Sequence, residues 1–235
     1  MAESDTGLLL YCITDASSAW PDEERGVRGG RLQRVVDGGL AAVVSRVEER
    51  TWMATPAAPE LLAYERAIRA QHAIADVLPM RFGSVLLDEA AVRAHLDEQR
   101  AAYLRALERV SGCVEMGVRA LLSAPPPPSA PVKPKSRSGA DYLAARRHHY
   151  SAENRLRDQG AALERALLAK VAPLCREHRS ELSAPRPGEP ALCSLYFLVP
   201  RDRVPAFRAA LSPDSGEVPA ELALSGPWPP FNFMA

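Results

Sequence analysis

The histidines and cysteines of this sequence have the side chains best suited to metal binding and nucleophilic catalysis, but their spacing fits neither. The five histidines form no H-x-x-x-H or H-E-x-x-H pattern, in which two ligands share one helical face. His148 and His149 are adjacent, and adjacent residues on a helix point about 100° apart, which makes a poor chelate. The histidines therefore predict no metal site.

The four cysteines stand alone, because no C-x-x-C pair occurs and none lies in a recognisable motif with a histidine. Cys12, Cys113 and Cys193 lie in apolar runs with strand character, where a free cysteine behaves as a small buried hydrophobe. The glycine pairs at 29–30 and 38–39 lack the spacing of phosphate-binding loops, and no Gly-x-Ser-x-Gly elbow is present. These patterns predict a reduced, cytosolic protein with no catalytic residue, metal or cofactor.

The overall composition argues against two classes of partner. Lysine plus arginine and aspartate plus glutamate both number 29 among 235 residues, so no net charge steers the chain toward nucleic acid or an acidic membrane. No apolar run approaches the ~20 residues that span a bilayer. The 47% hydrophobic fraction is enough for a globular core. We therefore expect a globular protein that binds neither nucleic acid nor a membrane.

The first half of the chain is organised around the apolar run Val77–Leu87, which lies between two amphipathic helical patterns at 59–76 and 88–110. Such a run is typical of a buried strand whose sheet is covered by helices. Pro79 lacks an N–H, so it is expected at the start of a strand or on an edge. Arg81 is the one charge in the run. In one interpretation Arg81 points outward to solvent or pairs with a carboxylate. In the other it marks a contact surface together with Phe82.

The other elements of the first half are a strand at 7–14 and a hairpin. The hairpin pairs 31–36 with 40–45 through Asp37-Gly38-Gly39, whose glycines supply the positive φ angles that a tight turn requires. The predicted element order is β-β-β-α-β-α, an α+β sandwich of the ferredoxin-like kind.

The second half predicts a β-α-β-α-β sandwich. The run 112–122 alternates with period two, with Val114 and Met116 on one face and Glu115 on the other. The predicted elements that follow are one long helix at 140–182 that Pro173 kinks or breaks, a strand at 191–199, a helix at 202–211 and a strand at 219–225.

The Pro-rich stretch 123–139 fits an interdomain linker, a ligand for a partner's groove or a mobile loop. Because the strand before it needs partners from downstream, we assign it as a loop within the second domain. The predicted domains are therefore 1–111 and 112–235, with the C-terminal tail 226–235 in the second.

The tail combines three prolines with three large aromatic residues between positions 225 and 235. Prolines on either side of Trp228 stiffen an extended segment, so that holding it in place costs little entropy. Exposed aromatics at a stiff terminus either pack back onto their domain or form a binding surface.

These stretches together resemble one family. The ending Gly226-Pro-Trp-Pro-Pro-Phe-Asn-Phe233 resembles that of the gas vesicle protein F/L (GvpF/GvpL) family, and Val77-Leu-Pro-Met-Arg-Phe-Gly83 resembles its second hallmark. The segments 9–13, 38–45 and 139–143 fit the same family in the same order. Phe231 stands where tyrosine is usual, and Tyr64 stands where many members have histidine. The motif residues so matched are Pro79, Gly83, Gly226, Pro227, Trp228, Pro229, Pro230, Phe231 and Phe233.

The resemblance implies a two-domain α+β protein with a ferredoxin-like N-terminal domain and a second domain closed by the tail. It also implies a minor structural or accessory component of gas vesicles that is not an enzyme. Such proteins bind the small hydrophobic shell protein and assist nucleation or assembly of the shell. On this hypothesis Arg81 and Phe82 contact the shell protein and limit its aggregation, the tail braces the two domains, and the protein resides in the cytoplasm and at the gas vesicle. Two alternatives are a scaffold that links other accessory proteins and a small-molecule-sensing module.

Overall fold

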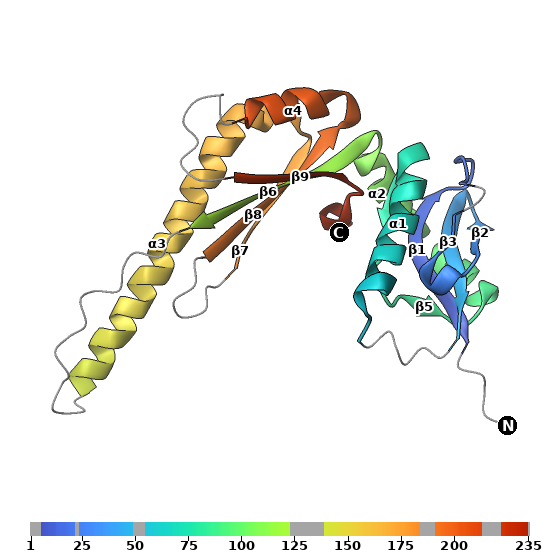
Figure 1. Cartoon of the computed structure of the whole chain (residues 1–235), viewed down its shortest axis with the longest axis horizontal. Coiled ribbons are helices and arrows are strands. Elements are labelled where there is room, and N and C mark those ends of the chain that lie inside the picture. Colours follow the sequence, from blue (N-terminus) through green and yellow to red (C-terminus); the bar gives the residue numbers. More distant parts are fainter. Residues whose placement is uncertain are drawn as a thin grey trace. The chain divides into compact units, whose positions relative to one another are not determined.

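The computed structural model describes residues 6–21, 24–48, 55–122, 139–183, 191–212 and 222–234, and for 139–153 it describes the backbone alone. The Pro-rich loop expected at 123–139 lies outside these ranges, except for Gly139. The predicted α+β class is confirmed, with two sheets and helices packed on them (Figure 1). Among the described helices, none is both long and apolar enough to span a membrane.

The chain forms two compact units, Met1–Glu115 with Pro227–Ala235, and Met116–Gly226. The division lies four residues after the expected boundary at Ser111, and most of the tail groups with the first unit instead of the second. Two contacts account for the boundary. Ser111 and the N–H of Gly112 both donate to the Asp76 carboxylate at 3.0 Å, which ties the start of the connecting strand to the first unit.

The sheet of the first unit has the order β2-β3-β1-β4, with β5 also pairing β1, and these strand pairs are all antiparallel. The bounds of its strands are β1 Gly7–Asp15, β2 Leu32–Asp37, β3 Leu40–Val47, β4 Val77–Pro79 and β5 Val85–Leu86. The predicted order β-β-β-α-β-α is present, with the short β5 added. The predicted hairpin is present too, and Gly38 and Gly39 have φ angles of +50° and +85°.

The first unit's two helices are α1 (Ala58–Ile74) and α2 (Glu89–Val110). Every residue of β1 from Gly7 to Thr14 is buried, as a strand covered on both faces must be. One buried cluster packs Tyr64 and Ile68 of α1 against Tyr11 and Val43 of the sheet. Helix α2 begins where the carboxylate of Asp88 accepts a hydrogen bond from the N–H of Ala91 at 2.8 Å, a standard N-cap.

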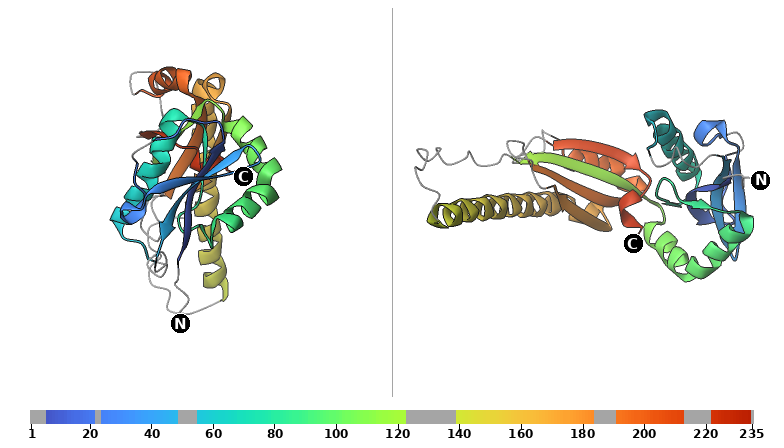
Figure 2. Two further views of the ribbon diagram at one scale, coloured as in Figure 1. Left: turned by 90° about the vertical axis from the view of Figure 1, so that its right-hand side faces the viewer. Right: turned by 90° about the horizontal axis from the view of Figure 1, so that it is seen from below.

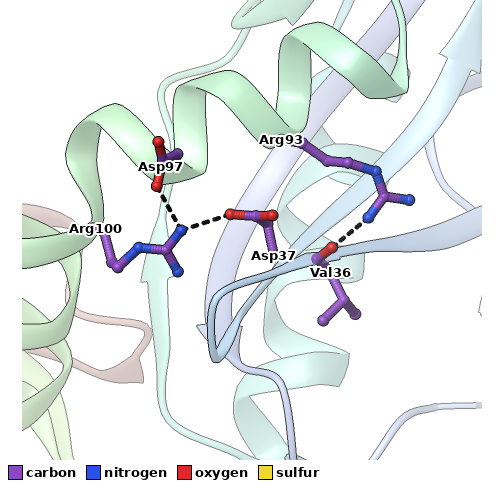
Figure 3. Close-up of polar contacts among 5 residues, drawn as sticks. All are labelled: Val36, Asp37, Arg93, Asp97 and Arg100. Atoms are coloured by element: carbon purple, nitrogen blue, oxygen red, sulfur yellow. Dashed lines mark hydrogen bonds and ion pairs between the residues drawn. The ribbon is translucent and has the colours of Figure 1, made fainter.

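Helix α2 also holds the turn end of the β2–β3 hairpin (Figure 3). The guanidinium of Arg100 donates to Asp37 at 2.7 Å and to Asp97 at 2.6 Å. Two turns earlier, Arg93 donates to the carbonyl oxygen of Val36. Arg93 and Arg100 thus fix the hairpin against the helix, and Asp97 holds Arg100 from within α2.

The sheet of the second unit has the order β7-β8-β6-β9. Its elements are β6 Cys113–Leu122, α3 Gly139–Val171, β7 Glu177–Leu182, β8 Ala191–Pro200, α4 Val204–Ala210 and β9 Leu222–Trp228. This β-α-β-β-α-β order with its strand arrangement is the ferredoxin-like one. Helix α3 continues past the end of β6, as Figures 1 and 2 show.

One predicted element of the second unit is wrong. The helix expected to run to position 182 ends at Val171, where Pro173 lies in a short 3-10 turn, and Glu177–Leu182 forms β7. β7 pairs antiparallel with β8, and His178 stands opposite Phe197 with their rings stacked 6.3 Å apart. The apolar periodicity that predicts the helix ends at Leu174, and the strand beyond it forms through pairing with β8, which no local pattern records.

Candidate interaction surface

The turn between β4 and β5 holds Arg81 in a fixed backbone conformation. Both ends are tied to β1, since the N–H of Met80 donates to the carbonyl of Tyr11 and the N–H of Leu10 donates to the carbonyl of Ser84, each at 2.8 Å. Within the turn, Ser84 donates to the carbonyl of Arg81 from its N–H at 3.1 Å and from its hydroxyl at 2.7 Å. Gly83 has a φ of +85°, which glycine adopts readily.

Pro79 ends β4, an edge strand of the first sheet. Because the N–H of Met80 faces β1, the nitrogen of Pro79 faces the open side of the edge. The open side therefore lacks one donor, which makes pairing with another strand less favourable there. Pro79 therefore lies on an edge strand, as its missing N–H predicts.

Phe82 and Arg81 point to different environments. The ring of Phe82 is half-buried and meets Tyr64 edge-on at 5.1 Å, and Tyr64 in turn stacks on Tyr11 at 4.9 Å. Arg81 is exposed, and within the described ranges its guanidinium has no hydrogen-bond or ion-pair partner. Of the two residues predicted to form a contact surface, Phe82 therefore packs against Tyr64, and Arg81 is exposed.

Tyr64 positions this turn. Its hydroxyl lies 2.8 Å from the carbonyl oxygen of Leu10 and 3.0 Å from that of Met80, so it can donate to either. Burial raises the pKa of the Tyr64 phenol, which keeps it a donor. In the sequence, the one sign that pointed to Tyr64 was that many family members have histidine at this position.

Apolar side chains are exposed on the same helix. Leu61 and Leu62, in the first turns of α1, are 43% and 65% exposed. Leu61 lies one helical turn before Tyr64 and so continues the stripe that packs on the sheet. We define the Arg81 surface as Arg81 and Phe82 of the turn together with Leu61 and Leu62, which α1 exposes near its start.

The C-terminal tail packs onto the first unit. Asn232 donates to the carboxylate of Glu115 from its main-chain N–H at 2.8 Å and from its side-chain amide at 2.7 Å. Arg109 donates to the carbonyl of Phe233, whose ring is fully buried. Positions 232 and 233 of the tail thus pack onto the first unit, and not onto the second domain to which the tail was assigned.

The other tail residues divide by exposure. Gly226 has a φ of +102°, and the guanidinium of Arg69 lies 4.9 Å from the centre of the Trp228 ring. Pro229 and Pro230 are buried, whereas Pro227 and Phe231 are exposed.

Glu115 corrects one expectation. The period-two pattern placed it on the outer face of its strand, but it is 4% exposed and buried under the tail. Its hydrogen-bond donor comes from position 232, too far along the chain for any local pattern to reveal.

The cysteines and acidic groups show no arrangement suited to chemistry in the part of the chain that the structure describes. Cys12, Cys113 and Cys193 are buried, and burial raises the pKa of the Cys12 thiol. No group of three or more histidine, cysteine, aspartate or glutamate side chains within those ranges could hold a metal ion.

Comparison with known proteins decides the family. The sequence model of the family described as gas vesicle synthesis protein GvpL/GvpF matches residues 7–235. The chain belongs to the GvpL/GvpF family. This confirms the resemblance drawn from the Val77–Gly83 and Gly226–Phe233 motifs. Membership supports a gas vesicle accessory role for the chain.

Individual relatives match over nearly the whole length. Gas vesicle protein L of Streptomyces sp. (strain CB03234) is 30% identical over 95% of this chain and 91% of its own. Gas vesicle protein F of the same strain is 30% identical over 96% of this chain and 98% of its own.

Two crystal structures share the fold. The gas vesicle protein GvpF of Anabaena sp. PCC7120 superposes with a TM-score of 0.75 at 17% identity, covering 98% of this chain and 96% of that one. The GvpF of Microcystis aeruginosa gives a TM-score of 0.72 at 14% identity, covering 97% and 99%.

Proposed function

We propose that this gas vesicle protein is a non-enzymatic assembly factor that binds the small hydrophobic shell protein and limits its aggregation before the shell grows. The observation that carries the proposal is the Arg81 surface, where an exposed cation stands on a rigid turn held by Tyr64 of α1, and the same helix exposes Leu61 and Leu62 near its start. Exposed apolar side chains combined with a fixed charge are typical of a protein-binding surface.

The rigid backbone of the Arg81 turn favours binding by this surface. The turn is fixed by hydrogen bonds to β1 and by the Tyr64 hydroxyl, so binding costs little ordering of the backbone. Leu61 and Leu62 supply apolar contact area, and Arg81 supplies a directional donor group at its rim. Because Pro79 removes a donor from the adjacent edge, the protein covers an aggregation-prone subunit without offering that edge as a template for further strands.

The test is co-purification with the shell protein, combined with light scattering of shell protein diluted from denaturant. Arg81→Glu is expected to lower capture about fivefold, because reversing one rim charge changes binding by about 1 kcal/mol. Arg105→Glu is the matched control, since Arg105 is also exposed but lies on α2. Equal capture by the two variants, or no slowing of aggregation by the wild type, would refute the proposal.

A second candidate, a scaffold for other accessory proteins, is favoured by one observation. Helix α3 spans Gly139–Val171 and projects past the sheet that it covers (Figures 1 and 2). Pull-downs of the other accessory proteins in the absence of shell protein distinguish the two. Capture that does not respond to Arg81→Glu supports the scaffold.

A further inference from the structure

The outer edge of β2 carries backbone groups that β3 does not use. The N–H of Ala16 donates to the carbonyl of Gly39 at 2.9 Å, so the backbone of Ala41, two residues on, also faces β1. Val36 stands opposite Ala41 across the β2–β3 pair and therefore points its N–H and C=O away from β3. Arg34, two residues earlier, does the same.

Most of these outward groups are open. The carbonyl of Val36 accepts from Arg93 of α2, which closes the turn end of the edge (Figure 3). The N–H of Val36 and both backbone groups of Arg34 have no hydrogen-bond partner among the residues described. β2 is the outermost strand of its sheet (Figure 1), so a further strand can reach these groups.

Two arginines face each other at the other end of the same edge. Arg25 and Arg31 form an isolated antiparallel bridge just before β2, which places their side chains on the same face. Both are exposed, and neither guanidinium has a partner in the part of the chain that the structure describes. Directly opposed like charges destabilise a strand pair, so an anion bound between them would relieve a cost built into the fold.

The turn between these arginines is held firmly. The N–H of Val27 donates to the buried hydroxyl of Tyr11 at 2.8 Å, and the N–H of Gly26 donates to the carbonyl of Gly30 at 2.8 Å. Arg28, at the tip, has a φ of +53°, the one positive φ of a non-glycine residue in the described ranges. Such backbone strain is retained where surrounding structure enforces it, often at binding sites.

From this combination we infer that the β2 edge binds an extended segment of a partner protein that carries acidic residues at its C-terminal end. The segment adds antiparallel to β2, as all neighbouring strands do. It exchanges hydrogen bonds with the backbone of Arg34 and Val36, and its terminal carboxylates lie against Arg25 and Arg31. This inference does not depend on the Arg81 surface, which lies at the opposite edge strand of the sheet.

Charge and backbone together favour a peptide over a nucleic acid or polyphosphate. A polyanion would use the guanidinium groups alone and would gain nothing from the open N–H and C=O groups. A peptide strand satisfies both sets at once, with the main chain providing affinity and the charges setting register and direction.

The test uses the full chain and three labelled hexapeptides. The first alternates threonine and valine and ends in two glutamates, the second ends in two lysines, and the third carries its two glutamates at the N-terminus. Amide NMR shifts measure binding at each residue. We expect saturable shifts at the amides of Arg34 and Val36 with the first peptide, and at least about tenfold weaker binding of the other two, since both lose the charge contacts.

Two variants separate the contributions. Arg25→Glu/Arg31→Glu is expected to weaken the first peptide about tenfold and to favour the lysine-ended one. Val36→Pro removes only an outward N–H and is expected to weaken the first peptide about threefold to tenfold, whereas Val36→Thr leaves it unchanged. Thermal unfolding shows whether each variant is folded. If Val36→Pro does not fold, Arg25→Glu/Arg31→Glu by itself tests the inference.

Several results would overturn the inference. One is the absence of shifts at Arg34 and Val36 with millimolar first peptide. Another is binding of a ten-nucleotide single-stranded DNA or of tripolyphosphate at the arginines without any peptide binding, which would indicate a polyanion site. A third is a shift of the same two amides with protein concentration alone, which would make a second copy of this chain the occupant. Loss of shell-protein binding in Arg81→Glu with peptide binding intact would leave this inference standing and affect only the proposed function.

Discussion

The carboxylate of Glu115 anchors the C-terminal tail, and its removal is expected to be among the most destabilising single changes in the first unit. Glu115 is 4% exposed and accepts two hydrogen bonds from Asn232, at 2.8 and 2.7 Å. Hydrogen bonds to a charged group contribute about 1.5–3 kcal/mol each. Because Asn232 is half-exposed and can regain water, the lower values apply, and Glu115→Ala should cost about 3 kcal/mol.

The measurement is urea and thermal unfolding followed by tryptophan fluorescence, to which Trp228 in the tail contributes. For a chain of this size, each kcal/mol lowers the Tm by about 2–4 °C, so Glu115→Ala should lower it by about 6–12 °C. Glu115→Gln keeps one acceptor oxygen but turns an NH2 group toward the donors of Asn232, so about half of the loss is expected.

A charge variant of the partner tests the same contact from the other side. Asn232→Asp places a second carboxylate against Glu115, and the repulsion should destabilise the tail at neutral pH. The loss should shrink as the pH falls far enough to protonate one of the two carboxyl groups, because the neutral acid can donate to its neighbour.

Glu108→Ala is the matched control, because Glu108 is an exposed glutamate on α2 and its removal should change stability by no more than about 0.5 kcal/mol. If Glu115→Ala is as mild as Glu108→Ala, the tail is held by Phe233 and not by the buried carboxylate, and the reasoning above is refuted.

Three further predictions concern other parts of the molecule. Tyr64→Phe removes the hydroxyl between two carbonyls and should lower the free energy of unfolding in urea by about 1–1.5 kcal/mol. Amide exchange in the Arg81 turn should become faster, and unchanged exchange would show that the hydroxyl does not hold the turn. Gly38→Ala places a Cβ 0.9 Å from an Arg100 nitrogen, whereas Gly39→Ala meets nothing within 4 Å. Both strain a positive φ, so Gly38→Ala should be less stable by about 0.5–1 kcal/mol through displacement of Arg100, and equal stabilities would contradict this. Iodoacetamide at pH 8 should label the half-buried Cys175 before the three buried cysteines, and peptide mapping shows the order. Labelling of Cys175 should become faster as the pH rises, because burial raises the pKa of its thiol.

Features encoded within a few residues were predictable from the sequence. Asp37-Gly38-Gly39 predicts a tight hairpin because only glycine takes up positive φ without strain, and that hairpin is present. The missing N–H of Pro79 predicts an edge position, and β4 is an edge strand. In each case the cause acts locally, so the pattern and the structure share one physical origin.

Features set by distant partners were not predictable. The long helical pattern was extended to position 182, yet 177–182 becomes β7 because β8 supplies a pairing edge. Glu115 looks like an outward residue of a half-buried strand until Asn232, from the tail, covers it. The roles of Tyr64 and of the Arg25–Arg31 pair likewise depend on which strands become neighbours. Such contacts are properties of the fold and not of any window of sequence.

The two edges of the first sheet differ in a way that bears on function. At β4 the nitrogen of Pro79 removes a donor from the open side, and the Arg81 turn offers side chains in place of backbone. At β2 the outward N–H of Val36 and the outward backbone groups of Arg34 have no partner among the residues described, and Arg25 and Arg31 stand opposite each other at the site inferred for an acidic segment. Under the proposed function, the protein benefits from keeping these two activities apart. It can hold apolar surface at the edge where strand pairing is disfavoured, and confine strand addition to the edge where charge selects the partner.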